Sequence, residues 1–362
     1  MESILSTKYY VHFNENAYFS LKAYLKDNFH SKIFILVDAN TKKHCLEMFL
    51  ENAQLPSDIE IIEIEAGESF KNIDTCSFLW NKLSELGADR KSLMINLGGG
   101  VITDMGGFVA STFKRGIRFI NIPTTLLSMV DASVGGKTGV DLGALKNQIG
   151  LFSNPEMVLI DMNFLDTVSE REMKSGLAEI IKYGFTFDQN LWLTIKEFKE
   201  VERETIRKLV HRSVVIKNNV VLADLLENDI RKSLNFGHTI GHAIESYFLE
   251  SAHKENLTHG EAIAIGMVIE LYYSSKVLDL PLDLAEELLG FINNFYGKVN
   301  IQKEDYPEII DLMKFDKKNV SGKVNFVLLE TLEKCKLDIQ LPADLIEEGL
   351  LFYAHASVKQ ND

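Results

Sequence analysis

Residues 92–111 read SLMINLGGGVITDMGGFVAS, and this stretch decides the fold class. The apolar run at residues 93–97 is typical of a buried strand, and three glycines lead from it into helical spacing. Because glycine has no side chain, backbone N–H groups at the start of such a helix can approach a phosphate group closely. The stretch lacks the common GxGxxG fingerprint, and a flexible turn is the alternative interpretation. We therefore expect an α/β fold with a phosphate-binding turn here.

An earlier strand supplies polar residues to the same kind of sheet edge. Residues 33–38, IFILVD, predict a buried parallel strand, and residues 42–53 predict a helix after it. Asp38 and Asn40 follow at the carboxyl end of the strand, where an acid commonly meets a ribose hydroxyl in doubly wound sheets. Simple turn formation is the alternative for both residues.

Length and composition limit the number and kind of domains that the chain can form. Its 362 residues are 46% hydrophobic and 25% charged, which is a globular balance with room for two domains. Strand signals fade after about residue 160, so we predict an α/β domain over residues 1–160 and a mainly α-helical domain over residues 161–362. No apolar run reaches the length of about 18 residues that a membrane span needs, and the N-terminus has no signal-peptide pattern. We expect a cytoplasmic protein that binds neither membranes nor, with a net charge of −14, nucleic acid.

The densest group of reactive side chains lies in residues 231–261, RKSLNFGHTIGHAIESYFLESAHKENLTHGE. His238 and His242 stand four apart and share one helix face, with Glu245 one turn further on. A Thr-x-x-Glu capping box opens a second helix at His259. Imidazoles at this spacing, with a third ligand from elsewhere, suit a divalent ion such as zinc. Hydrogen-bonded structural histidines are the alternative.

A candidate for an anionic third ligand precedes this stretch. A capping box at Ser169 opens a helix that includes SGLAEIIKYG, and we expect the helix to end at Gly184. Glu179 lies three residues before Lys182 on this helix, so a surface ion pair is the alternative interpretation.

Between the two regions, residues 115–140 read RGIRFINIPTTLLSMVDASVGGKTGV. The GGKT segment lacks the earlier glycine of a Walker loop, which argues against an ATPase. Lys137 can still bind a substrate phosphate as a point charge. Arg115 can belong to the same charged surface, although a solvated arginine is the simpler interpretation.

Seven motifs occur in one order: GGGVITDMGGF, RGIRFINIPTTLLSMVDASVGGKTGV, KNQIG, SGLAEIIKYG, RKSLNFGHTIGHAIE, HGEAIAIGM and DKK. With them the chain resembles the 3-dehydroquinate synthase family of sugar-phosphate cyclases over nearly its whole length. The resemblance implies a dinucleotide-binding α/β domain and a helical metal and substrate domain. It also implies a phosphate-eliminating lyase that cyclises a seven-carbon keto-acid phosphate in the shikimate pathway, with NAD and a divalent metal, zinc before cobalt. A homodimer is implied as well, because Arg115 in such enzymes reaches the neighbouring subunit's phosphate site.

The resemblance assigns roles residue by residue. The implied metal ligands are Glu179, His238 and His259. His242 becomes a proton-transfer or phosphate-side residue with Glu227 as its acidic counterpart, and the other catalytic positions are Lys182, Arg231 and Asn235. The implied NAD-binding residues are Asp38, Asn40, Glu68, Lys71, Gly99, Gly100, Val101, Asp104, Thr124, Thr125, Lys146, Phe164 and Thr167. The implied substrate-binding residues are Arg115, Asp131, Lys137, Asn147, Lys217 and Lys318.

Two features depart from the family pattern. Residues 141–147 read DLGALKN where the family often has Asn-His-Pro-x-Gly-Lys-Asn, and extra residues separate His242 from His259. Three other functions stay open on the residues alone. A related sugar-phosphate cyclase would not need Lys217 and Arg231 as a carboxylate clamp. A metal-dependent polyol dehydrogenase would have little use for so many phosphate-binding cations, and a non-catalytic binding module would not need its catalytic residues.

Overall fold

The structure, a computed structural model, describes residues 1–56, 58–143, 145–314 and 323–356. Contacts divide the chain into two compact units. The first unit comprises Met1–Met173 and Arg203–Leu222, and the second comprises Lys174–Glu202 and Ala223–Asp362. This grouping differs from the continuous ranges 1–160 and 161–362 in that residues 203–222 return to the first unit. The roles assigned to the two domains stay predictions.

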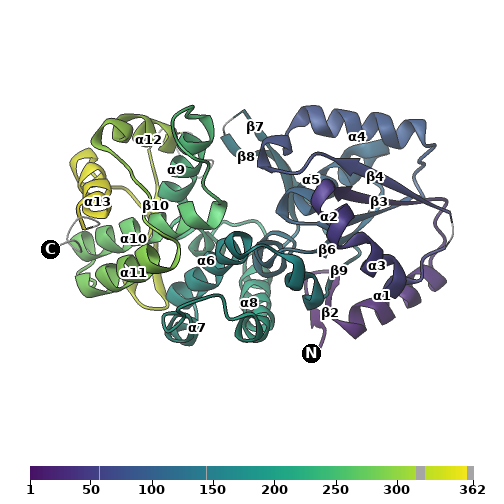
Figure 1. Ribbon diagram of the computed structural model, residues 1–362, viewed down its shortest axis with the longest axis horizontal. Helices are drawn as coiled ribbons and strands as arrows, with labels where there is room; N and C mark the ends of the chain where they lie inside the picture. The colour runs from purple at the N-terminus through teal and green to yellow at the C-terminus, as the bar shows by residue number, and fades with distance from the viewer. Residues whose placement is uncertain (57, 144, 315–322, 357–362) are drawn as a thin grey trace. The chain divides into compact units, whose positions relative to one another are not determined.

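A largely parallel sheet is the centre of the first unit (Figure 1). Within the described residues its seven strands lie in the order β1-β2-β9-β6-β5-β3-β4, and β1 alone is antiparallel to its neighbour. The strand bounds are Ile4–Leu5 (β1), Tyr10–Phe13 (β2), Ile33–Asp38 (β3), Ile59–Ile64 (β4), Leu93–Gly98 (β5), Arg118–Pro123 (β6) and Met157–Ile160 (β9). A separate two-stranded antiparallel sheet is formed by the hairpin of Lys137–Leu142 (β7) and Leu145–Phe152 (β8).

Most helices of the first unit connect these strands, and the last one joins the unit from later in the chain. The helices are Glu15–Asp27 (α1), Ala39–His44 (α2), Leu46–Ala53 (α3), Ile73–Glu85 (α4), Gly100–Thr112 (α5) and Arg203–Ala223 (α8), with short turns at Glu68–Phe70, Phe113–Arg115, Ser128–Ala132 and Met162–Thr167. The predicted strand at residues 33–38 is confirmed. The helix predicted over residues 42–53 is two helices, because Cys45 leaves helical geometry at φ −121°.

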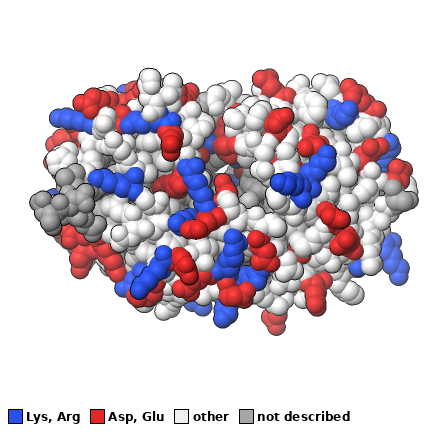
Figure 2. All heavy atoms as spheres, viewed as in Figure 1, with Lys and Arg blue, Asp and Glu red and all other residues white. Residues whose placement is uncertain are grey.

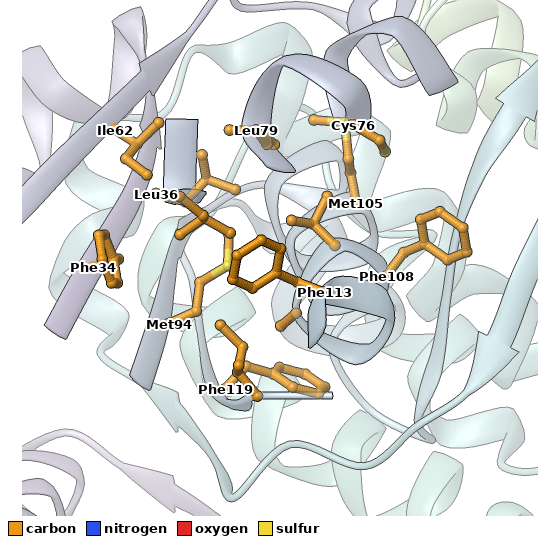
Figure 3. Close-up of a cluster of buried hydrophobic side chains, with 14 of the residues drawn as sticks. Phe34, Leu36, Ile62, Cys76, Leu79, Met94, Met105, Phe108, Phe113 and Phe119 are labelled. Carbon is orange, nitrogen blue, oxygen red and sulfur yellow. The ribbon is translucent and has the colours of Figure 1, made fainter. Parts of the chain in front are cut away.

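The core of this unit lies between the sheet and helices α4 and α5. Figure 3 shows apolar side chains from β3, β5 and β6 meeting those of the two helices, among them Phe34, Met94, Met105 and Phe119. Burying side chains of this size is the main favourable term in folding, at about 1.5–3 kcal/mol each. The core fixes β5 against α5, and so fixes the glycine turn between them.

Helix α8 joins the first unit through polar contacts as well as apolar ones. The Lys217 ammonium donates to the carboxylate of Asp131 at 2.7 Å, and Asn218 donates to the backbone oxygen of Leu5 at 3.0 Å. Arg203, at the start of the helix, donates to the backbone oxygens of Leu165 and Val168. Buried donors need such partners, so α8 completes the first unit although 29 residues of the second unit, 174–202, precede it.

The second unit is mainly helical, as we predicted. Its elements are Glu170–Thr186 (α6, whose first turn belongs to the first unit), Gln189–Ile195 (α7), His238–Glu250 (α9), His259–Val277 (α10), Leu282–Phe295 (α11), Tyr306–Met313 (α12), Ala343–Ala356 (α13) and the hairpin of Phe326–Thr331 (β10) and Lys334–Ile339 (β11). The prediction that Gly184 ends a helix is wrong, since α6 continues to Thr186. Gly184 serves close approach instead: a Cβ there would lie 2.7 Å from the backbone nitrogen of Trp192 in α7.

Helices α9 and α10 cross with their backbones in contact. A Cβ at Gly266 of α10 would lie 2.0 Å from the backbone oxygen of Gly237 and 2.8 Å from the nitrogen of Gly241. Gly237 itself has φ +79°, in the left-handed region that favours glycine, and it immediately precedes α9. The crossing therefore brings His238 and His259, the first residues of the two helices, close together.

No helix in the described ranges is long and apolar enough to cross a membrane. On the face drawn in Figure 2, acidic and basic side chains are interspersed.

Candidate functional site

Glu179 is the centre of a cluster of ionisable side chains in the second unit. Its Oε1 lies 3.3 Å from His238 Nε2 and 3.3 Å from His259 Nε2, while its Oε2 accepts a close hydrogen bond from the Lys182 ammonium. Both Glu179 and Lys182 are almost completely buried. The interpretation of this pair as a surface contact is therefore excluded.

Each of these two histidines is oriented by a partner on its other ring nitrogen. His238 Nδ1 lies 3.0 Å from the backbone oxygen of Phe236, and His259 Nδ1 lies 3.0 Å from Glu245 Oε2. Both partners are acceptors, so each Nδ1 carries the proton and donates it. When both rings are neutral, their Nε2 lone pairs point toward the position beside Glu179 Oε1. Such outer partners are typical of metal-binding histidines, and the donor set fits a divalent metal.

Burial and the neighbouring charges set the protonation of this cluster. Burial would raise the pKa of Glu179, but the Lys182 cation and His238 hold that pKa well below its usual range. Burial, together with the Lys182 cation, lowers the pKa of His238 to about 4. Burial also disfavours charge on His259, yet the carboxylates of Glu245 and Glu179 raise its pKa to about 10. At neutral pH Glu179 is thus an anion, His238 a neutral ring and His259 a cation, and His259 must release its Nε2 proton before that nitrogen can bind a metal.

His242 gives a second possible ligand set. Potential ligand atoms of His238, His242 and His259 all lie within 4.8 Å of one another. Two observations favour Glu179 over His242 as the third ligand. Its Oε1 lies 3.3 Å from both Nε2 atoms, and its negative charge offsets a buried cation, as three neutral rings would not.

The remaining catalytic candidates of the second unit lie along residues 224–235. Asn235 Nδ2 donates to Glu227 Oε1 at 2.8 Å, so these two predicted residues are brought together. Glu227 has φ +62°, a left-handed conformation that is costly for a non-glycine residue and is often found at functional sites. Arg231 is 1% exposed, and its guanidinium donates to the backbone oxygen of Leu225 at 2.8 Å.

The glycine turn of the first unit is shaped as a cradle. Gly99 immediately precedes α5 and Gly100 begins it. A Cβ at Gly99 would lie 3.2 Å from the Thr125 side chain, and the backbone nitrogen of Thr124 donates to the oxygen of Gly98 at 3.0 Å. The predicted pair Thr124 and Thr125 therefore borders the turn, and a side chain at Gly99 would fill the space in front of it. This arrangement fits a phosphate-bearing ligand.

A charged network lies close to this turn. Lys71 Nζ donates to Asp104 Oδ2 at 2.7 Å and to Asn147 Oδ1 at 2.8 Å. Lys146 Nζ donates to Glu68 Oε1 at 2.7 Å. The sequence analysis assigned Glu68, Lys71, Asp104 and Lys146 to NAD and Asn147 to the substrate, and the structure brings all five side chains into one network. Burial alone would lower the pKa of Lys71, but the carboxylates of Asp104, Glu68 and Asp141 raise it above its usual value.

Asp141 is a member of this network that the sequence analysis did not assign to the site. Its Oδ1 accepts from the Asn147 backbone nitrogen at 2.6 Å, its Oδ2 from Lys146 Nζ at 3.3 Å, and its own backbone nitrogen donates to the oxygen of Lys71. Asn147 is held at φ +51°. Asp141 thus holds Lys146 and Asn147 in place from within the altered sequence. In the sequence, the signal for this role was a carboxylate six residues before Asn147.

The other predicted nucleotide-binding residues lie around the ends of β3 and β9. Asp38 caps α2 by accepting from the Thr41 backbone nitrogen at 2.8 Å, and Asn40 is exposed in the first turn of α2. The Cys45 thiol, whose pKa burial raises to about 11, contacts the side chains of Thr167 and Thr124. Thr167 in turn donates to the backbone oxygen of the buried Phe164. Val101 follows in α5 and packs against the core.

The substrate candidates of the first unit are less concentrated. Asp131 and Lys217 form a close pair at 2.7 Å, and Lys217 is buried. Arg115 is exposed and lies in a left-handed turn at φ +68°. Lys137 begins β7 and is half-buried. Lys318 lies outside the described residues.

The extra residues between His242 and His259 are anchored at Asp305. Its Oδ1 accepts from the Tyr247 hydroxyl at 2.6 Å and its Oδ2 from Lys254 Nζ at 2.6 Å. Burial would raise the pKa of Asp305, but these donors and the backbone nitrogen of Gln302 lower it. Asp305 therefore ties the last turns of α9, through Tyr247, to the segment that leads into α10, through Lys254.

Replacing Asp305 by Asn should destabilise the protein by about 1.5–3 kcal/mol at pH 7, the range for hydrogen bonds to charged groups. A carboxyl with a lowered folded-state pKa contributes stability above its unfolded pKa of about 3.9, and loses it as pH falls through the folded pKa. The difference between D305N and the parent should thus shrink below about pH 4. Urea unfolding at several pH values measures it, with D311N, at an exposed pair with Lys314, as a control expected to change little. A difference independent of pH would contradict this role.

Comparison with known proteins agrees with this geometry. The family described as 3-dehydroquinate synthase N-terminal matches residues 61–175, and 3-dehydroquinate synthase C-terminal matches residues 176–319. A 3-dehydroquinate synthase from Parabacteroides distasonis is 41% identical over 335 residues, which cover 92% of this chain and 94% of that protein.

Solved structures share the fold. A 2-deoxy-scyllo-inosose synthase in complex with carbaglucose-6-phosphate, NAD⁺ and Co²⁺ superposes with a TM-score of 0.82 at 23% identity, covering 96% of this chain and 99% of that one. A 2-epi-5-epi-valiolone synthase from Streptomyces hygroscopicus subsp. jinggangensis 5008, with NAD⁺ and Zn²⁺ bound, gives 0.79 at 23% identity, covering 98% and 99%.

These two structures show the fold class: a unit built on a largely parallel sheet and a mainly helical unit. The predicted fold class is confirmed. Since two family matches cover most of the chain and a relative is 41% identical over nearly all of it, the chain belongs to the 3-dehydroquinate synthase family. The family resemblance and the enzyme type predicted from the sequence are confirmed as well.

Proposed function

We propose that the protein converts 3-deoxy-D-arabino-heptulosonate 7-phosphate to 3-dehydroquinate and inorganic phosphate. Membership of the family supports the reaction, and one structural observation carries it. Glu179, His238 and His259 converge within the second unit, with a buried lysine beside them. A synthase that must activate a substrate hydroxyl needs such a site.

We assign the metal to Glu179, His238 and His259, and we expect zinc in preference to cobalt. We assign NAD to the glycine turn and its surroundings, with Gly99 and Gly100 against the phosphates, Asp38 at the ribose edge, and the remaining predicted residues around them. When bound, the metal polarises a substrate hydroxyl and NAD takes and returns one hydride, so the net redox change is zero.

The protein's own residues position the substrate and move protons. Lys182 and Arg231 are buried cations that can hold substrate oxygens, and Lys217 is oriented for the same task by Asp131. Asn235 fixes the Glu227 carboxylate, which can accept a proton, and His242 lies beside His238, with ring centroids 5.1 Å apart, where it can hold or pass one.

The other assignments rest on the family alone. Lys137, Asn147 and Lys318 are assigned to the substrate, and the phosphate can itself accept a proton during its elimination. A homodimer places Arg115 near a partner's phosphate site. The cytoplasmic location expected from the sequence stays a prediction.

Phosphate release and NADH absorbance, followed together, test this function. The metal-loaded protein is incubated with the seven-carbon keto-acid phosphate and catalytic NAD. We expect many turnovers of phosphate with no net NADH, and dehydroquinate by mass spectrometry. No phosphate release from this substrate would overturn the assignment. Turnover of a hexose 6-phosphate would then indicate a related cyclase, and NADH accumulating with a polyol would indicate a dehydrogenase.

A further inference from the structure

Glu270 is a buried carboxylate that no role assigned so far uses. It lies in α10 and is 0% exposed. Its Oε2 accepts a hydrogen bond of 2.7 Å from the backbone nitrogen of Gly237. Taking a carboxylate out of water is costly, so such a group persists where its hydrogen bonds hold something in place.

The contact falls at the junction that sets the candidate metal site. One face of α10 presents residues 259, 263, 266 and 270, which are three or four positions apart along the helix. His259 begins this stripe, Gly266 touches the backbone of Gly237, and Glu270 ends it. One face of α10 therefore supplies one metal ligand and holds the residue before the other ligand, His238.

Gly237 needs this support. Backbone N–H groups at the start of a helix have no partner within it, and a buried one must find an acceptor elsewhere. Gly237 is also in the left-handed conformation, and because glycine can adopt other backbone angles about as readily, a hydrogen bond to its N–H helps to fix this one. The orientation of the His238 ring depends on this turn, because its Nδ1 lies against the backbone oxygen of Phe236, on the other side of Gly237.

We propose that Glu270 is a positioning residue for the metal site: by holding the Gly237 N–H it fixes the first turn of α9 and keeps His238 Nε2 directed at the position beside Glu179. This inference rests on the proposed function insofar as the cluster binds a divalent metal.

Metal affinity of three variants separates positioning from general stability. E270L removes the acceptor, E270Q keeps an oxygen that can accept from Gly237, and Y273F removes a buried hydrogen bond of 2.8 Å from the same helix to the backbone oxygen of Ile346. Each full-length variant is stripped of metal and titrated with Zn²⁺ against a chromophoric chelator. Co²⁺ absorption spectra report the ligand geometry, and thermal unfolding reports stability.

We expect E270L to bind Zn²⁺ about 10–100-fold more weakly with an altered Co²⁺ spectrum, the usual effect of losing an outer partner. E270Q should restore the affinity and spectrum, and Y273F should lower the melting temperature while leaving both unchanged. The proposal is overturned if E270L binds like the parent, if E270Q fails to rescue, or if Y273F weakens binding equally. A parent that binds metal but makes no dehydroquinate would overturn the proposed reaction alone, while a parent without metal binding at these histidines would overturn both.

Discussion

Replacing Glu179 by Gln should abolish tight metal binding and reduce turnover to background. The substitution removes the only anion among the assigned ligands, so affinity should fall further than the 10–100-fold typical of outer partners, by at least about 100-fold. It also leaves the buried Lys182 cation without its counter-charge, which is expected to cost about 3–5 kcal/mol of stability. Metal content after dialysis, kcat and the urea midpoint measure the three effects.

The matched variant is His242→Asn, which distinguishes the two possible ligand sets. If His242 passes protons and does not bind the metal, H242N should keep its metal and lose about 10²–10⁴ in rate. The assignment of Glu179 fails if E179Q retains the metal while H242N loses it. In that case the three histidines would be the ligands.

Replacing Gly266 by Ala should strongly destabilise the second unit. The added methyl would lie 2.0 Å from the backbone oxygen of Gly237 and 2.8 Å from the nitrogen of Gly241. These are backbone atoms, so no side chain can rotate away and helices α9 and α10 must separate. Overpacking costs about 1–3 kcal/mol and occasionally more, and we expect the upper end here. Metal affinity should fall as well, because the two histidines move apart.

Gly290 of α11 is the control for this effect. A Cβ there meets nothing within 4 Å, so G290A should stabilise the protein by about 0.5–1 kcal/mol through the lower entropy of the unfolded chain. Thermal unfolding of both variants beside the parent is the measurement. A G266A protein as stable as the parent would show that the helix crossing is looser than described.

The sequence predicted local features well and long-range ones poorly. The strand at residues 33–38 and the capping box at Thr258 follow from the spacing of residues close in the chain, and both are confirmed. Gly184 was misread because its neighbour, Trp192 of α7, is brought close only by the fold. The return of α8 to the first unit was missed for the same reason: nothing near residue 217 in the sequence indicates a partner at Asp131.

The candidate site shows the same limit. Histidine spacing indicated a metal site, but the preference for Glu179 over His242 as third ligand came from the family resemblance and stays a prediction. The support by Glu245 and Glu270 could not be predicted, because each contact joins residues at or in different helices. The support by Asp141 is local, but it depends on how the β7–β8 hairpin turns back on itself.

The path of the chain through its two units has a consequence for how the protein can be divided. The polypeptide passes from the first unit to the second after Met173, returns at Arg203 and leaves again after Leu222. No single cut separates the units, and neither exists as one uninterrupted stretch of the gene. An N-terminal fragment that stops before α8 would leave Asp131 and the Leu5 backbone oxygen without Lys217 and Asn218. A fragment or gene fusion that keeps the first unit whole must therefore also carry the inserted residues 174–202 of the second unit.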